Sequence, residues 1–100
     1  MEATAENQST RAIKYRLVGE VQGVGFRGFI KSKAQEFDLS GFASNEADGS
    51  LAVLLIGDDE QIGRLQPFLY QGPPGARVVT VTEILPEDED ITSEAGFSIR

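Results

Sequence analysis

The order in which strand-like and helix-like segments follow one another is the feature that most restricts how these 100 residues fold. Apolar residues alternate with polar ones over residues 11–18, which is typical of a strand with one buried face. Over residues 26–37 the apolar spacing changes to three and four, which predicts an amphipathic helix. Residues 41–45 then indicate a second strand, and residues 51–56 a third.

The third strand and the segment after it carry the clearest boundary signals. Residues 51–56 are almost entirely apolar, so this strand belongs in the middle of a sheet that is covered on at least one side. The Asp-Gly pair at 48–49 predicts a hairpin turn before it. A second helix is expected to begin at Asp58 as N-cap, with Gln61 completing a capping-box-like pair, and to end at the Gly-Pro-Pro-Gly run of residues 72–75.

Pro67 conflicts locally with this second helix. Proline removes a backbone donor, and its ring crowds the carbonyl four residues earlier, at Gly63. We expect a kink or a break at Pro67, or a helix that restarts there.

The complete order of elements predicts the fold class. A strand over 78–85, an acidic loop over 87–94 and a short strand over 97–100 complete the chain. The order βαββαβ plus a terminal strand predicts a ferredoxin-like α+β sandwich with a mainly antiparallel sheet. Right-handed connections put the third strand between the first two and both helices on one face. We expect one domain over 11–100, preceded by a disordered tail over 1–10.

Composition excludes several classes of function. The net charge of −7 argues against non-specific nucleic-acid binding. The sequence has no cysteine, which excludes disulfides, thiol chemistry and Cys-ligated metals, and no histidine, the usual acid–base group at neutral pH. No apolar run could cross a membrane, and no secretory signal pattern is seen at the N-terminus, so the cytoplasm is the default location.

The basic residues are unevenly distributed. Six of the nine lie in the first third of the chain: Arg11, Lys14, Arg16, Arg27, Lys31 and Lys33. This distribution indicates either an anion-binding site or ordinary solvated charges, and charge alone does not decide between them.

The glycine-rich segment over residues 19–27 is the candidate anion site. Glycines let successive N–H groups converge on one anion, and the start of the following helix adds further free N–H groups. Arg27 contributes a planar guanidinium that matches phosphate oxygens. The predicted phosphate-binding residues are Gln22, Gly23, Val24, Gly25, Phe26 and Arg27. The alternative is a tight turn that holds no ligand.

These residues also carry a family resemblance. The run Gly19-x-Val-Gln-Gly-Val-Gly-Phe-Arg27 closely resembles the signature of the acylphosphatase family. Residues 41–50 resemble that family's Gly-x-x-x-Asn-x-x-Asp-Gly hairpin, and residues 72–76 and 97–99 are similar to its later landmarks. The resemblance spans about residues 13–100. It implies a ferredoxin-like fold and an enzyme that hydrolyses acyl phosphates to a carboxylate and inorganic phosphate, with no metal and no organic cofactor. We expect the chain to be a monomer.

The resemblance also implies roles for two residues. Arg27 matches the family's phosphate-binding arginine, and Asn45 matches its water-orienting asparagine. Without the motif, Asn45 reads as a turn-capping residue beside a hairpin. Because the first and second strands should run parallel, the loop after Val18 and the end of the strand at Asn45 should emerge at the same edge of the sheet.

The missing histidine leaves the proton acceptor open. Asn45 can orient water but cannot usefully accept its proton. Phosphoryl transfer depends mainly on positioning and charge stabilisation, so the water proton is expected to pass to a substrate phosphate oxygen. The competing interpretation is that Glu46 or Asp48 acts as the base.

One residue departs from the family, and other functions remain possible. Gly28 stands where many relatives carry a bulky residue, which leaves the helix start looser and the edge of the cradle more open. A ferredoxin-like fold also suits RNA binding, but the first strand has Tyr15 as its only aromatic residue and the chain is acidic. A carbamoyl phosphate domain, as in larger hydrogenase-maturation carbamoyltransferases, and a degenerate phosphate-binding protein are the further alternatives.

Overall fold

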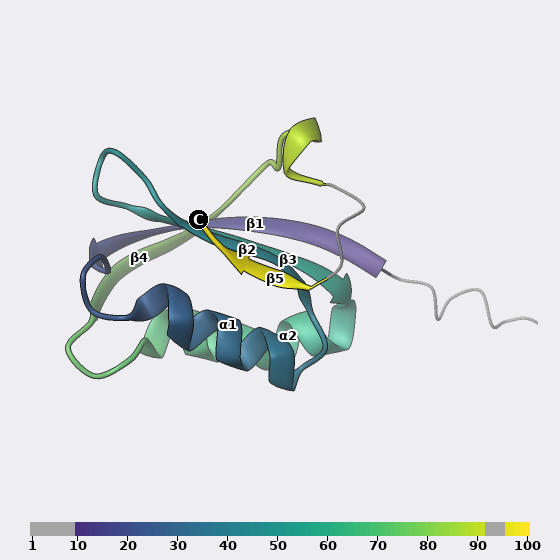
Figure 1. Ribbon diagram of the computed structural model, residues 1–100, viewed down its shortest axis with the longest axis horizontal. Coiled ribbons are helices and arrows are strands. Elements are labelled where there is room, and N and C mark those ends of the chain that lie inside the picture. The colour runs from purple at the N-terminus through teal and green to yellow at the C-terminus, as the bar shows by residue number, and fades with distance from the viewer. Residues whose placement is uncertain (1–9, 92–95) are drawn as a thin grey trace, which may run out of the picture.

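The elements follow the predicted order in the computed structural model, which describes residues 10–91 and 96–100 (Figure 1). The strands and helices are β1 (Thr10–Glu20), α1 (Phe26–Glu36), β2 (Ser40–Asn45), β3 (Leu51–Asp58), α2 (Asp59–Gln71), β4 (Arg77–Ile84), the 3-10 turn η2 (Asp88–Asp90) and β5 (Phe97–Ile99). Thr10, assigned to the tail by sequence, is the first residue of β1. The rest of the predicted tail and residues 92–94 of the predicted acidic loop lie outside the described residues.

The five strands form one sheet in the order β4-β1-β3-β2-β5. The apolar β3 lies between β1 and β2, as predicted, and is antiparallel to both, so β1 and β2 run parallel to each other. β5 adds to the outer edge of β2 in the parallel direction. Both helices cover one face of the sheet (Figure 1). This arrangement confirms the ferredoxin-like fold.

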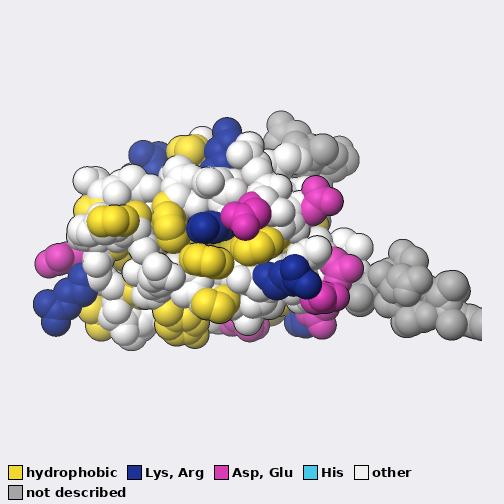
Figure 2. Space-filling view, turned by 90° about the horizontal axis from the view of Figure 1, so that it is seen from below, with side chains coloured by type: hydrophobic (Ala, Val, Ile, Leu, Met, Phe, Trp, Pro, Cys, Tyr) yellow, Lys and Arg dark blue, Asp and Glu magenta, His cyan; other side chains and the backbone are white. Residues whose placement is uncertain are grey.

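The main core lies between the sheet and the helices, because β1 and β3 turn alternate apolar residues towards α1 and α2. Its fully buried large side chains include Leu17, Phe26, Ile30, Leu51, Leu55, Ile62, Leu65 and Leu69. A smaller cluster of Phe42, Ala52 and Leu54 lies apart from it. Viewed from the helical side, hydrophobic side chains alternate with charged ones (Figure 2). In this layer Lys33 Nζ lies 4.4 Å from the ring centroid of Phe68.

Two predictions about α2 are wrong in part. Asp58 caps the helix by accepting a hydrogen bond from the Glu60 N–H (3.0 Å), but Gln61 does not complete a capping box, since its Oε1 is buried without a partner in the described part of the chain. α2 also continues through Pro67 without the expected break or restart. Pro67 and Gly63 are both exposed, so water can satisfy the Gly63 carbonyl that loses its helical donor.

β1 extends further than the sequence predicted. It continues through Gly19 to Glu20, with an irregularity in its pairing with β4 between Val18 and Gly19. The bulge lets the strand absorb a glycine with a φ of 140° instead of ending at it. A Cβ at Gly19 would collide with the carbonyl oxygen of Arg77, so the close approach of β1 and β4 requires glycine here.

The segment after β4 lies on the side of the sheet away from the helices (Figure 1). Its η2 turn is joined to β1 by an ion pair between Lys14 Nζ and Asp90 Oδ2 (2.7 Å), and both side chains are mostly buried. Neither described helix is long and apolar enough to cross a membrane.

Candidate active site

Two segments that are far apart in the sequence meet at one end of the sheet. The β1–α1 loop (residues 21–25) follows β1, and the hairpin turn (residues 46–50) follows β2. Because β1 and β2 run parallel, both segments emerge at the same end, as predicted from the strand order (Figure 1). The loop supplies most of the lining of the candidate site, and the hairpin turn directly follows Asn45, which also lines it.

The β1–α1 loop takes its shape from backbone conformation. Gly23 and Gly25 have φ angles of 78° and 80°, and Gly25 is the left-handed N-cap of α1. The N–H of Phe29 is bonded to the Gly25 carbonyl (3.0 Å), so the preceding N–H groups of the first helical turn, including those of Arg27 and Gly28, have no intrahelical acceptor. Free N–H groups beside left-handed glycines at the positive end of a helix form an anion-binding concavity.

The turn between α2 and β4 supports this loop from behind. Phe26 is buried, and a Cβ at Gly72 would come within 2.9 Å of its ring. A Cβ at Gly75 would lie 3.9 Å from Val24 Cγ1. The glycine and proline run over residues 72–75 therefore not only ends α2 but also packs closely against the loop.

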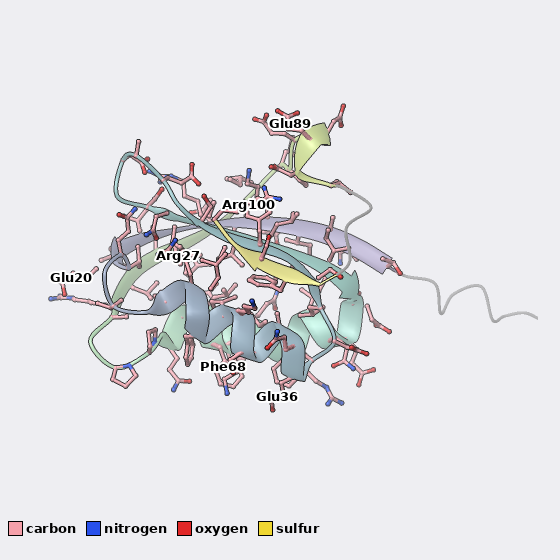
Figure 3. The ribbon with its side chains drawn as sticks, in the orientation of Figure 1. Glu20, Arg27, Glu36, Phe68, Glu89 and Arg100 are labelled. Carbon is pink, nitrogen blue, oxygen red and sulfur yellow. The ribbon has the colours of Figure 1, made fainter. Side chains whose placement is uncertain are left out.

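Arg27 is hydrogen-bonded to Arg100, the last residue that the structure describes. Its Nη1 donates to the Arg100 carbonyl oxygen (2.9 Å), and the Arg100 N–H donates to the Ala43 carbonyl (2.8 Å). Figure 3 shows Arg27 at the start of α1, with Arg100 above the sheet on the side away from the helices. There the Arg100 guanidinium carbon lies 4.0 Å from the Phe42 ring centroid. One guanidinium N–H group of Arg27 is thus occupied, which leaves other donors for a ligand.

Arg100 is a site contact that the sequence did not predict. The final strand was recognised, but its parallel pairing beside β2 was not, and only that pairing brings the Arg100 carbonyl to Arg27.

Asn45 and Arg27 both line a small pocket of about 120 Å³. It is the exposed last residue of β2 and pairs with Leu51 of β3. The small pocket is lined by Val21, Gly23, Gly25, Phe26, Arg27, Gly28, Asn45 and Ile99. Four of the predicted phosphate-binding residues, Gly23, Gly25, Phe26 and Arg27, are among them, and Gly28 lies at the same pocket as expected. Gln22 and Val24 are not part of this lining.

The side chain of Gln22 instead contacts the hairpin turn next to Asn45. Its Nε2 donates to the carbonyl oxygens of Glu46 (2.8 Å) and Ser50 (2.9 Å). The β1–α1 loop and the hairpin turn are therefore joined by one amide group.

The carboxylates of Glu46 and Asp48 face a different cavity. A larger hollow of about 350 Å³ lies on the sheet face away from the helices, and we call it the open-face hollow. It is lined by Lys14, Arg16, Glu46, Ala47, Asp48, Ser50, Ala52 and Ile84. Within the described ranges, neither Glu46 nor Asp48 lines the small pocket.

Asp48 is fully engaged in hydrogen bonds. Its Oδ1 accepts from Ser50 Oγ (2.6 Å) and the Ser50 N–H (2.9 Å), while its Oδ2 accepts from Arg16 Nη2 (2.8 Å). The hydrogen bond from the Ser50 hydroxyl, followed by that from Arg16, holds the pKa of Asp48 well below its usual range. An ionised carboxylate with so low a pKa is a poor base near neutral pH.

Ion pairs account for most of the basic residues in the first third of the chain. Four of them pair with carboxylates: Arg11 with Asp59, Lys14 with Asp90, Arg16 with Asp48, and Lys33 with Glu36. Among residues 10–91 and 96–100, Arg27 forms an ion pair with no Asp or Glu side chain. The same residues contain no group of three or more acidic side chains placed to hold a metal ion.

Known proteins resemble this chain along nearly its whole length. Residues 13–99 match the sequence model of the Acylphosphatase family. An acylphosphatase of Rhizobium meliloti is 38% identical over 89% of this chain and 92% of its own length. The structure of an acylphosphatase from Coxiella burnetii superposes with a TM-score of 0.79 at 32% identity, covering 100% of both chains. HypF from T. kodakarensis also superposes (TM-score 0.75, 27% identity, 88% of this chain), but the match covers 11% of HypF.

Proposed function

Because the chain belongs to the acylphosphatase family, we propose that it hydrolyses acyl phosphates in the small pocket, with Arg27 holding the phosphoryl group and Asn45 orienting the attacking water. The enzyme is a hydrolase of small acyl phosphates, and its products are a carboxylate and inorganic phosphate. The observation that carries the proposed roles is that Arg27 and Asn45, which are separated in sequence, line one pocket together with the glycines of the β1–α1 loop.

The loop suits the phosphoryl group because its positive charge and its N–H donors are fixed in advance. Gly25, the N-cap of α1, and the first helical residues, including Arg27, line the same small pocket. Donors that do not have to reorganise stabilise the charge on the phosphoryl oxygens throughout the reaction. Gly23, Gly25 and Phe26 are the loop residues we propose for this contact, and Gln22 and Val24 contribute through their position in the loop.

The reaction exchanges one phosphorus–oxygen bond for another. Water held by Asn45 attacks phosphorus in line with the bond to the carboxyl oxygen, and that bond breaks as the new one forms. The leaving carboxylate takes the bonding electrons. The proton of the water passes to a phosphoryl oxygen, which yields inorganic phosphate.

A dedicated protein base is not needed in this scheme, and the two candidate carboxylates are poorly placed for that role. Glu46 and Asp48 line the open-face hollow, and both oxygens of Asp48 already accept hydrogen bonds. We therefore expect Glu46→Gln and Asp48→Asn to retain turnover. A loss of about 100-fold or more in either folded variant, the size of a general base's contribution, would favour the carboxylate as the base.

The carbamoyl phosphate alternative that the sequence raised provides a second candidate substrate. The small pocket would hold the same phosphoryl group in either case, and only the acyl part would differ. A monomeric state and a location in the cytoplasm are further proposals from the sequence. Light scattering and fractionation of cells test them.

The direct test is hydrolysis of benzoyl phosphate and carbamoyl phosphate by the purified chain in the presence of a metal chelator. Inorganic phosphate should inhibit competitively. Arg27→Ala should raise KM and lower kcat, because the guanidinium contacts both the bound substrate and the transition state. Asn45→Ala should lower kcat mainly.

Two results would contradict these assignments. A wild-type chain that binds phosphate but turns over neither substrate would be a binding protein. An Asn45→Ala variant with a raised KM and an unchanged kcat would place Asn45 in substrate binding and not in positioning water.

A further inference from the structure

We propose that Gln22 is a positioning residue that fixes Asn45 relative to the phosphate-binding loop, and that its side chain does not itself bind phosphate. The proposal rests on the function proposed above for Asn45. It assigns Gln22 a role different from the one that the sequence motif indicates, and it comes from the contacts of a single amide group.

The Gln22 amide contacts the hairpin at the rung next to Asn45. Glu46 directly follows Asn45, and Ser50 directly precedes Leu51, the partner of Asn45 in the sheet. The Glu46 N–H donates to the Ser50 carbonyl (2.9 Å), which closes the hairpin at this rung. Gln22 Nε2 donates to both carbonyls of the same rung, at 2.8 and 2.9 Å. It therefore holds both strands of the hairpin where Asn45 leaves the sheet.

The same contacts exclude the Gln22 side chain from phosphate binding. A glutamine amide has two N–H donors and a carbonyl oxygen that only accepts. Two hairpin carbonyls occupy the nitrogen, and the remaining oxygen would repel an anion. While both bonds are made, the side chain has no donor to give to a phosphoryl group.

The other end of this contact, at Gln22 itself, lies next to the small pocket. Gln22 is followed by Gly23, which lines the small pocket with Arg27 and Asn45. The Gln22 side chain thus links the phosphate-binding loop to the hairpin rung that directly follows Asn45. In-line attack needs water within a narrow range of positions, and an error of about 1 Å can lower the rate by about 100-fold.

The hairpin has a second attachment on its other side, through Asp48. Arg16 and Ser50 hold that carboxylate, and Ser50 is the one described polar residue that is buried, at 3% exposure. Asp48 shapes the turn, whereas Gln22 alone of these side chains comes from the β1–α1 loop. This difference makes Gln22 the contact that sets the hairpin turn, and with it Asn45, against the β1–α1 loop.

The test compares Gln22→Ala in the wild-type background with Gln22→Ala in the Asn45→Ala background. We expect kcat for benzoyl phosphate to fall by roughly 10- to 100-fold in the first, with KM and the inhibition constant of inorganic phosphate changed by less than about threefold. In the Asn45→Ala background the same substitution should change kcat by less than about threefold, because the group that Gln22 positions is already absent.

Gln66→Ala is the matched control. Gln66 Nε2 also bridges two elements, donating to the Tyr15 hydroxyl of β1 (2.8 Å), but it does so away from the pocket. This variant should lose stability without losing kcat. Gln22→Met, which keeps the length of the side chain and removes its donors, should reproduce the kinetics of Gln22→Ala if that variant folds poorly.

Hydrogen exchange of the Glu46 amide provides a readout that does not depend on turnover. Exchange should be faster in Gln22→Ala than in the wild type, and unchanged in Gln66→Ala. A wild-type chain without hydrolase activity would contradict the proposed function, and the exchange rates would still decide whether Gln22 fixes the hairpin.

Three outcomes would overturn the proposal. The first is a kcat loss of equal size with and without Asn45. The second is a rise in KM and in the phosphate inhibition constant at constant kcat, which would make Gln22 a phosphate ligand. The third is unchanged exchange of the Glu46 amide in Gln22→Ala.

Discussion

The β1–α1 loop lines the small pocket, and the hairpin turn directly follows Asn45; the two segments are built in different ways. The β1–α1 loop is shaped by backbone, through left-handed glycines, the N-terminus of α1 and close packing of Phe26 against Gly72. The hairpin turn is shaped by side chains, through the amide of Gln22 and the carboxylate of Asp48. Apart from the Arg27 guanidinium, the loop offers an anion backbone N–H donors that remain when side chains are truncated, whereas the geometry of the hairpin depends on a few replaceable groups.

This difference predicts that substitutions in the two segments affect different properties of the enzyme. Substitutions in the hairpin should act mainly on kcat, because they displace Asn45 and leave the anion cradle intact. Substitutions of the loop's glycines should act first on stability, because they change the backbone that makes the cradle.

Gly19→Ala, where β1 enters the loop, should destabilise the protein most. The new methyl group would collide with the Arg77 carbonyl at a φ of 140°, so both overpacking and backbone strain apply, at about 3 kcal/mol together. Gly49→Ala in the hairpin is the matched control, since its φ is 92° but no atom lies within 4 Å of the new Cβ. It should cost only about 1 to 2 kcal/mol. Urea denaturation measures both, and equal losses would contradict the expected difference.

Asp48→Ala should lower kcat by about three- to tenfold with little change in KM, because the hairpin loses its hydrogen bonds from Ser50 and Arg16 and Asn45 becomes less well fixed. Steady-state kinetics with benzoyl phosphate provide the measurement. A raised KM at constant kcat would show that the hairpin contributes to binding.

The same carboxylate gives a pH dependence of known sign. The folded-state pKa of Asp48 is lowered, so its contribution to stability is complete above the unfolded carboxyl pKa of about 3.9 and is lost as the pH falls through the lowered folded value. The difference in unfolding free energy between wild type and Asp48→Ala should be constant from pH 7 to 5 and shrink below pH 3.9. A difference that grows in acid would contradict the hydrogen bonds assigned to Asp48.

Gly28→Ala should have the smallest effect on stability, and it should stabilise the protein slightly. No atom lies within 4 Å of a Cβ at this position in the first turn of α1, and alanine is the better helix former by up to about 1 kcal/mol. Thermal unfolding should occur at a slightly higher temperature, with kcat and KM near those of the wild type. A marked rise in KM would mean that the open edge of the pocket admits the acyl group.

The sequence predicted the fold well because its signals are local and agree with one another. The apolar run of β3 and the amphipathic spacing of α1 fixed the element order, and connection rules then placed β3 between β1 and β2. The errors also have local causes. Pro67 does not break α2 because it lies on the exposed face, while Ile62, Leu65 and Leu69 anchor the other face on the sheet.

The site was harder to predict where it depends on pairing between distant segments. The motif indicated Arg27 and Asn45, and parallel strands explain why they meet. The contact of the Arg100 carbonyl with Arg27 joins segments that are distant in the sequence, and so does the contact of the Gln22 amide with the hairpin turn. Only the folded structure shows these two contacts. A motif gives the residue types of a site but not the partners of each side chain.

Titration of the chain with inorganic phosphate, followed by amide NMR shifts, tests whether the small pocket binds phosphate. We expect the largest shift changes on residues 23–28 and small ones in the hairpin turn. Arg27→Ala should make the shift changes smaller at each phosphate concentration. Shifts centred instead on Lys14, Arg16 and Asp48 would place phosphate in the open-face hollow and contradict the assignment of the small pocket as the active site.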